Sequence, residues 1–105
     1  MITIKDFDEF VNSLKQKDFY NAHEVLEKIW YPNRFKNSNE IKLLKGFINA
    51  AVSFELIKRG RKNQSKTPWK TYLKYRQLLF KLNSKQQNIY YLISLEIEKS
   101  KKDFN

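Results

Sequence analysis

The chain has 105 residues, a formal net charge of +10, 15% aromatic residues, two glycines, two prolines and no cysteine. This length predicts one domain with a modest core. The scarcity of glycine and proline argues against all-β and disordered chains, which are rich in turn residues. Without cysteine, disulfides and thiolate chemistry are excluded, and any metal site must use nitrogen and oxygen ligands.

The sequence also bears on membrane association. No stretch approaches the roughly 18 consecutive apolar residues of a membrane-spanning helix. The first residues, M-I-T-I-K-D-F-D, lack the basic start and long apolar run of a signal peptide. We therefore expect a cytoplasmic protein without a membrane partner.

Apolar spacing and capping residues predict five helices. The first is expected from about Ile4 to Leu14, with Thr3 as its cap and Asp6 in the capping-box position. The second, about residues 18–31, begins after Asp18 and carries the chain's only histidine. Pro32 is expected to stop it, because proline lacks an amide proton and restricts the residue before it.

The third helix, about residues 39–59, is predicted to be the longest and the central one, because it is apolar over most of its circumference. Gly60 is expected to end it in the C′ position. Within it, Gly46 would allow a neighbouring helix to approach closely. A fourth helix, about residues 67–82, is expected to begin with Pro68 in its first position.

A fifth helix is expected from Lys85 to about Lys99, with Ser84 and Gln87 forming its capping box. Residues 100–105 are expected to fray. Short connections favour antiparallel neighbours, so the predicted fold is an all-α, single-domain bundle of about five helices covering the whole chain.

The segment N-A-H-E-V-L-E-K-I-W holds a candidate polar pocket. His23 and Glu27 are four residues apart and therefore share a helix face, which Trp30 is expected to cover. On the third helix, Glu55 falls on an apolar face, where a carboxylate needs a partner. We expect that partner to be His23. The candidate pocket residues are His23, Glu24, Glu27, Trp30, Asn49 and Glu55.

Three interpretations of this cluster stay open. The first is a structural histidine–carboxylate pair, and the second is a small-ligand or metal pocket. The third is an acid–base enzyme that uses His23, Glu24 and Glu27. His23 and Glu27 supply only two ligands, whereas zinc takes four, so we expect neither a metal nor a cofactor.

The absence of catalytic motifs also favours a protein that is not an enzyme, and no catalytic residue is assigned. The segment H-E-V-L-E has glutamate where the zinc-protease motif H-E-x-x-H has its second histidine. Neither a nucleotide-cradling glycine-rich loop nor a nucleophile elbow is present.

Basic residues are concentrated in the second half of the chain. Residues 1–57 contain eight bases and eight acids, whereas residues 58–105 contain thirteen bases and three acids. Residues 58–85 contain no acid at all. Such a segment attracts anions, but charge runs of this kind are most often simply solvated, and that is the favoured interpretation here. The alternative is a surface that binds nucleic acid or an acidic protein, and the sequence leaves the partner open. The candidate anion-binding residues are Lys58, Arg59, Arg61, Lys62, Lys66, Lys70, Lys74 and Lys81.

Aromatic residues alternate with these cations, as in proteins that stack the bases of single-stranded nucleic acid. Helical spacing places most of these aromatic side chains in the core, and Tyr75 is the one expected to be exposed.

The segments D-F-Y-N-A-H-E-V-L-E-K-I-W and L-K-G-F-I-N-A-A-V-S-F-E-L-I-K-R-G together resemble the domain of unknown function 309 family of small helical bacterial and archaeal proteins. The resemblance covers about residues 18–62. It implies an all-α bundle in which the two signature helices pack together, and it implies no known activity. The motif positions are His23, Glu24, Glu27, Trp30, Gly46 and Gly60.

Two positions depart from the family pattern. Asn49 stands where the family commonly has glutamine, and Leu56 stands where many members have a second histidine. If the family cluster binds a metal through both histidines, this chain has lost one ligand. The resemblance therefore favours a structural role for the cluster here.

Together these features predict a cytoplasmic, non-enzymatic helical binding or interaction domain. We expect a semi-buried cluster of His23 and glutamates between the second and third helices, and a basic surface along residues 58–85. The ligand and the oligomeric state stay open.

Overall fold

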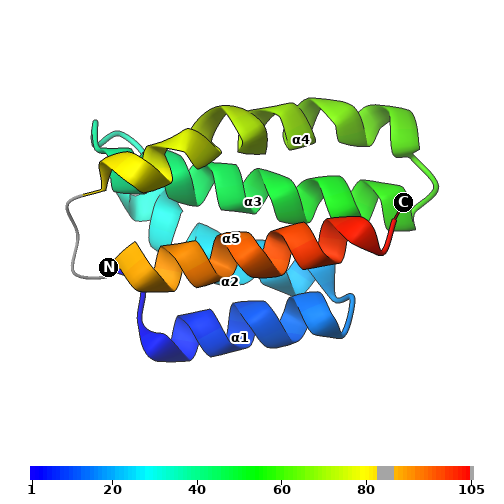
Figure 1. Ribbon diagram of the computed structural model, residues 1–105, viewed down its shortest axis with the longest axis horizontal. Helices are drawn as coiled ribbons and strands as arrows, with labels where there is room; N and C mark the ends of the chain where they lie inside the picture. The colour runs from blue at the N-terminus through cyan, green and yellow to red at the C-terminus, as the bar shows by residue number, and fades with distance from the viewer. Residues whose placement is uncertain (83–86, 105) are drawn as a thin grey trace.

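Helix α3 (Asn39–Lys58) runs through the middle of the molecule, with α4 on one side and α1, α2 and α5 on the other (Figure 1). It begins at Ser38, whose hydroxyl accepts the amide N–H of Ile41. Its buried residues include Leu43, Ile48 and Ser53, which lie on different sides of the helix. The prediction of a central third helix is thus confirmed.

The structure describes residues 1–82 and 87–104, and within them it contains five α-helices, one 3₁₀-helix and no strand. The other elements are α1 (Ile4–Lys15), α2 (Phe19–Asn33), α4 (Lys62–Arg76), η1 (Gln77–Lys81) and α5 (Gln87–Lys102). The Cα radius of gyration is 12.7 Å, which fits a single globule of about 100 residues. The predicted all-α fold is confirmed. No helix among the described residues is long and apolar enough to cross a membrane.

The predicted helix starts of α1 and α2 are present. At α1, the Thr3 hydroxyl accepts the Asp6 amide N–H, and the Asp6 carboxylate accepts the Thr3 amide N–H, each at 3.0 Å. This is the expected capping box. At α2, the Asp18 carboxylate accepts the amide N–H of Asn21 at 3.2 Å.

Two helices end in the same way. Gly60, after α3, has a φ of 80°, and Lys17, after α1, has a φ of 60°. At both ends, this residue and the next one donate their amide N–H groups to carbonyls three and five residues earlier, as in a Schellman motif. Gly60 therefore has the predicted C′ role. Lys58 at the end of α3 also donates its Nζ to the Lys17 carbonyl oxygen at 2.9 Å, which joins α3 to the α1–α2 turn.

Pro32 does not stop α2, contrary to prediction, because the helix continues to Asn33. A proline in the last turn removes only one backbone hydrogen bond. In addition, the Asn33 side-chain amide donates to the Ile29 carbonyl oxygen at 2.8 Å, which holds the end of the helix in place.

The predicted start of the fourth helix was also wrong. Helix α4 begins at Lys62, and Pro68 lies inside it. The first turn is bound to α3, because the buried Ser53 hydroxyl donates to the Ser65 carbonyl oxygen at 2.9 Å. Ser65 in turn donates its hydroxyl to the Lys62 carbonyl oxygen at 2.5 Å. Tertiary contacts therefore extend the helix ahead of its proline.

The C-terminal segment, whose residues 100–105 were expected to fray, continues α5 and packs against the core where the structure describes it. Helix α5 continues to Lys102, and the Phe104 ring lies 5.8 Å from Phe19 and 5.4 Å from Phe54, between centroids. This aromatic contact holds the segment against the core. The expected start at Lys85 and the Ser84 capping box lie outside the described residues.

A polar network joins α4 to α5, with Tyr72 at its buried end and the Arg76–Glu98 pair at its partly exposed end. The buried Tyr72 hydroxyl lies 3.1 Å from the Ser94 hydroxyl and donates to Glu98 Oε1 at 3.2 Å. Arg76 pairs with the same carboxylate oxygen at 2.6 Å. Burial raises the pKa of Tyr72 from 10.0 to about 12. At physiological pH the Tyr72 hydroxyl is therefore neutral, and it is hydrogen-bonded to Ser94 and Glu98.

Candidate functional site

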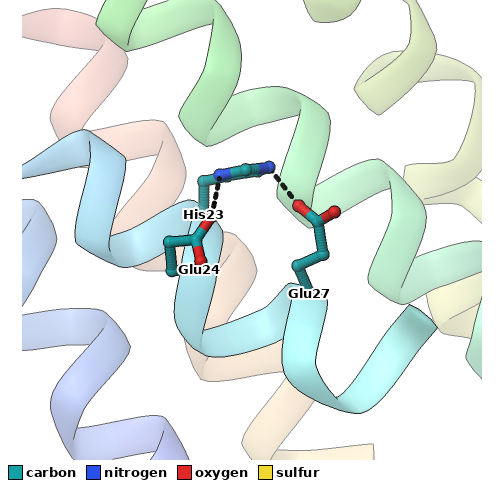
Figure 2. Close-up of side chains that lie close together, drawn as sticks. All are labelled: His23, Glu24 and Glu27. Carbon is teal, nitrogen blue, oxygen red and sulfur yellow. Dashed lines mark ion pairs between the residues drawn. The ribbon is translucent and has the colours of Figure 1, made fainter. Parts of the chain in front are cut away.

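The His23 imidazole lies between two carboxylates of its own helix, α2 (Figure 2). Its Nδ1 lies 3.3 Å from Glu24 Oε1, and its Nε2 forms a close ion-pair contact with Glu27 Oε2. Each ring nitrogen of His23 therefore faces a carboxylate oxygen. We call His23, Glu24 and Glu27 the polar cluster.

The polar cluster is semi-exposed. The side chains of His23, Glu24 and Glu27 are 24%, 40% and 37% exposed, respectively. They lie at the edge of the core formed by Ala22, Val25 and Leu26, which are buried. Water therefore screens the cluster, and its ion pairs contribute modestly to stability.

The polar cluster borders a mostly apolar groove between α2 and α3. The groove has a volume of about 230 Å³. Its lining residues are Phe19, Tyr20, His23, Val52, Glu55, Leu56 and Arg59. Of the six candidate pocket residues, only His23 and Glu55 line this groove.

Glu55 does not pair with His23, which corrects our expectation. Its Oε1 accepts Arg59 Nε at 2.9 Å, one turn further along α3. An arginine at i+4 on the same helix reaches the carboxylate directly. Because His23 has Glu24 and Glu27 on its own helix, neither residue needs the other as a partner.

Asn49 and Trp30 also lie elsewhere. Asn49 donates its side-chain amide to the Lys45 carbonyl oxygen of its own helix at 2.8 Å. Trp30, which was expected to cover the polar cluster, does not line the groove beside it. It lines a second pocket, at the corner where the α2–α3 loop meets α4.

We call this second pocket the corner pocket. Its volume is about 370 Å³. Its lining residues are Trp30, Arg34, Phe35, Lys36, Asn37, Ile41, Lys42, Lys45 and Tyr75. Four of these residues are cationic, three are aromatic and none is acidic. The sequence analysis missed the four cations, because bases and acids cancel over residues 1–57 as a whole. A local count over residues 34–45, with four bases and one acid, would have found them.

The polar cluster has the donor atoms of a metal site. One ligand atom from each of His23, Glu24 and Glu27 can be chosen so that all three lie within 4.8 Å of one another. Three protein ligands and water would complete the coordination of a divalent ion such as zinc. All three residues come from one helix, and His23 already contacts both carboxylates. The arrangement therefore also fits a structural ion-pair cluster that holds no metal.

The predicted basic residues fall into two groups. Lys58 and Arg59 are engaged within the chain, with the Lys17 carbonyl oxygen and the Glu55 carboxylate, respectively. The others are exposed on α4, just before it and on η1, and no ion pair among the described residues joins them to an acid. This second group, which we call the α4 face, comprises Arg61, Lys62, Lys66, Lys70, Lys74 and Lys81.

Comparison with known proteins places the chain in a family. Residues 7–67 match the model of a domain of unknown function (DUF309). The chain belongs to the DUF309 family. The match includes the polar cluster, the corner pocket up to Lys45 and the beginning of α4, so the DUF309 region carries both pockets except for Tyr75.

A similar protein gives no further indication of activity. An uncharacterized protein of Aquifex aeolicus (strain VF5) is 44% identical over 43 residues, which are 41% of this chain and 12% of that protein. The chain therefore matches only a small part of this longer relative. No solved structure matches the chain.

Proposed function

We propose that this chain is a non-enzymatic binding domain that binds polyanions, and single-stranded nucleic acid in particular, on its α4 face. The observation that carries the proposal is the row of unpaired cations. Lys62, Lys66, Lys70 and Lys74 follow one another at intervals of four residues, so they lie along one side of α4. The row is about 18 Å long at 1.5 Å per residue. Phosphates bound along it would release counterions, which favours association.

The polar cluster supports the non-enzymatic part of the proposal. Both nitrogens of His23 are engaged by carboxylates of its own helix, so neither is directed to a substrate. Each carboxylate is held by the same imidazole. The cluster therefore acts as a structural pair that fixes side chains along α2 next to the groove.

The α4 face can be tested by matched charge reversal. In one variant Lys70, Lys74 and Lys81 become glutamate, and in the control Lys5, Lys15 and Lys28 become glutamate. All six lysines are exposed, and the two variants have the same net charge. Binding of a fluorescent single-stranded oligonucleotide would be measured by anisotropy near physiological salt, with circular dichroism as the check of folding.

We expect the α4 variant to bind more than tenfold more weakly than the control variant. Equal weakening of both variants would contradict a dedicated face and indicate an effect of net charge alone. Binding weaker than about 10⁻⁴ M by the unaltered protein would be ordinary non-specific attraction and would leave an acidic protein as the partner of this face.

A second candidate function is divalent metal binding by the polar cluster, which the convergence of its three ligand atoms favours. Calorimetric titration of tag-free protein with zinc would test it. Stoichiometric binding that is lost in His23→Ala and weakens at low pH would support a metal site, because the imidazole must be neutral to coordinate the ion. If the unaltered protein releases no more heat on titration with zinc than the His23→Ala protein does, the metal site is contradicted and the structural pair is the only interpretation left.

A further inference from the structure

We propose that the corner pocket binds a nucleoside phosphate unit, with the base stacked on its aromatic side chains and the phosphate held by its cations. The inference rests on the proposed function, because it assigns the base contacts that the lysine row of the α4 face lacks. The unit can belong to a nucleic acid strand or be a free nucleotide, since both present a base beside a phosphate.

The charge of the corner pocket suits a phosphate. Arg34, Lys36, Lys42 and Lys45 line it without an acidic residue among the lining side chains. The acidic residues nearest in sequence to these cations contact other side chains. The Glu27 carboxylate contacts His23, and the Glu40 carboxylate accepts the hydroxyl of Tyr90. The pocket therefore presents four cations and no carboxylate to a ligand, which gives it a positive potential.

One of the four cations is held in a fixed position. The Arg34 guanidinium carbon lies 3.7 Å from the centroid of the Tyr31 ring and 4.5 Å from that of the Phe35 ring. Its Nη1 donates to the Tyr31 carbonyl oxygen at 2.6 Å. A guanidinium held in this way keeps further N–H donors for a phosphate oxygen, with little side-chain freedom to lose on binding.

The aromatic side chains of the pocket provide stacking surfaces. Phe35 is 88% exposed, whereas Trp30 and Tyr75 are half-buried. Exposed aromatic rings beside cations are the combination by which proteins bind unpaired bases without selecting a sequence. An isolated exposed phenylalanine needs no explanation, but this one lines a pocket with four cations.

The corner pocket is continuous with the α4 face through Tyr75. This residue lies on α4, and the Nζ of its neighbour Lys74 is 5.2 Å from the Tyr75 ring centroid. A strand that follows the lysines of α4 can therefore place one of its bases against Tyr75. Phosphate contacts would come from the α4 face, and base contacts from the corner pocket.

A matched pair of phenylalanine variants tests the base contact. Phe35→Ala removes a ring of the pocket, and Phe80→Ala removes a ring that is 80% exposed on η1 and does not line the pocket. Both losses are at the surface, so both proteins should remain folded. Each would be titrated with an oligothymidylate and with an abasic oligonucleotide of the same length, which has the phosphates without the bases.

We expect Phe35→Ala to bind the oligothymidylate several-fold to tenfold more weakly than Phe80→Ala does, and both to bind the abasic strand alike. The unaltered protein should prefer the oligothymidylate to the abasic strand by roughly tenfold or more. Equal binding of the two strands, or equal behaviour of the two variants, would overturn the proposal for the corner pocket. The α4 face would remain supported if charge reversal there still weakens binding.

Titration with adenosine monophosphate distinguishes the two sources of the ligand. Stacking on Trp30 should quench tryptophan fluorescence, and the quench should be absent in Trp30→Phe, which retains only Trp69. Saturable quenching would show that the corner pocket binds free nucleotides without contacts from the α4 face. If the mononucleotide does not quench but the preference for bases over the abasic strand persists, the site takes its nucleotide from a strand.

Discussion

Gly46 and Tyr75 lie so close together that no other residue type fits position 46 without movement. A Cβ atom on Gly46 would lie 3.0 Å from the Tyr75 Cβ and 3.8 Å from the Cα of Tyr72. The absence of a side chain at position 46 thus brings α4 against α3 and sets Tyr75 into the corner pocket. This glycine, which lies within the DUF309 match, therefore has a direct structural role in this chain.

Gly46→Ala should destabilise the protein, even though alanine favours a helix by up to about 1 kcal/mol over glycine. The added methyl group meets the base of the Tyr75 side chain, which cannot turn away without moving α4, and overpacking of this kind costs roughly 1–3 kcal/mol. We expect a net loss of about 1 kcal/mol in urea unfolding. A more stable variant would show that α4 can shift freely.

His23→Ala should cost about 1 kcal/mol or less. Removing one member of a fully buried ion pair costs roughly 3–5 kcal/mol, but His23 is 24% exposed and its carboxylates are more exposed still. Pairs at this exposure contribute little. Urea unfolding of His23→Ala beside Glu24→Gln and Glu27→Gln would measure it. A loss above about 3 kcal/mol would mean that the cluster is shielded from water.

Phe104→Ala should destabilise the protein by about 1–2 kcal/mol, because the ring packs against buried Phe19 and Phe54 while remaining half-exposed. Asp103→Ala is the control, since that side chain is exposed next to it. Thermal unfolding would compare the two. Equal melting temperatures would indicate that residues beyond Lys102 contribute nothing to the core.

Tyr72→Phe should alter the stability of the protein in alkali. The pKa of Tyr72 is raised to about 12 in the folded protein, above the 10.0 of an ordinary tyrosine. The corresponding stability is therefore complete below pH 10 and is lost as the pH rises through about 12, because the unfolded chain ionises first. Tyr90, whose pKa burial also raises, adds a loss in the same direction to both proteins.

At neutral pH, Tyr72→Phe should cost about 1–2 kcal/mol through the lost hydroxyl contacts with Ser94 and Glu98. Urea unfolding at about pH 7, about pH 9 and about pH 11 would follow the difference from the unaltered protein. We expect the difference in the free energy of unfolding between the two proteins to become smaller from about pH 9 to about pH 11. A difference that stays constant would mean that Tyr72 ionises in the folded protein as readily as in the unfolded chain.

The sequence predicted the fold well where local signals and tertiary packing agree. Thr3, Asp18 and Gly60 mark helix ends through bonds to their own backbone neighbours, which a sequence pattern contains. Pro32 and Pro68 were misleading because other contacts compensate for the missing amide. The early start of α4 depends on the hydrogen bond from Ser53 on α3 to Ser65. These residues are twelve positions apart, so a local sequence pattern does not reveal the contact.

The candidate site was only partly accessible from the sequence. Helical spacing was sufficient to bring His23 and Glu27 together, since both lie on one helix. The partner of Glu55 was predicted wrongly, although Arg59 lies four residues further along and the same helical spacing brings the two together. A contact with His23 depends instead on how α2 and α3 pack, which the spacing of residues within one helix does not determine. The corner pocket needs three elements at once, with Trp30 from α2, Lys45 from α3 and Tyr75 from α4. Only the fold shows that they meet.

The salt dependence of binding to a single-stranded oligonucleotide tests the central claim most directly. If the α4 face contacts about four phosphates, the logarithm of the association constant should fall with the logarithm of salt concentration with a slope of about −3. The Lys70→Glu, Lys74→Glu, Lys81→Glu variant should lose most of that slope, and the variant reversed at Lys5, Lys15 and Lys28 should keep it. A slope near zero, or the same slope in both variants, would contradict polyanion binding by the α4 face.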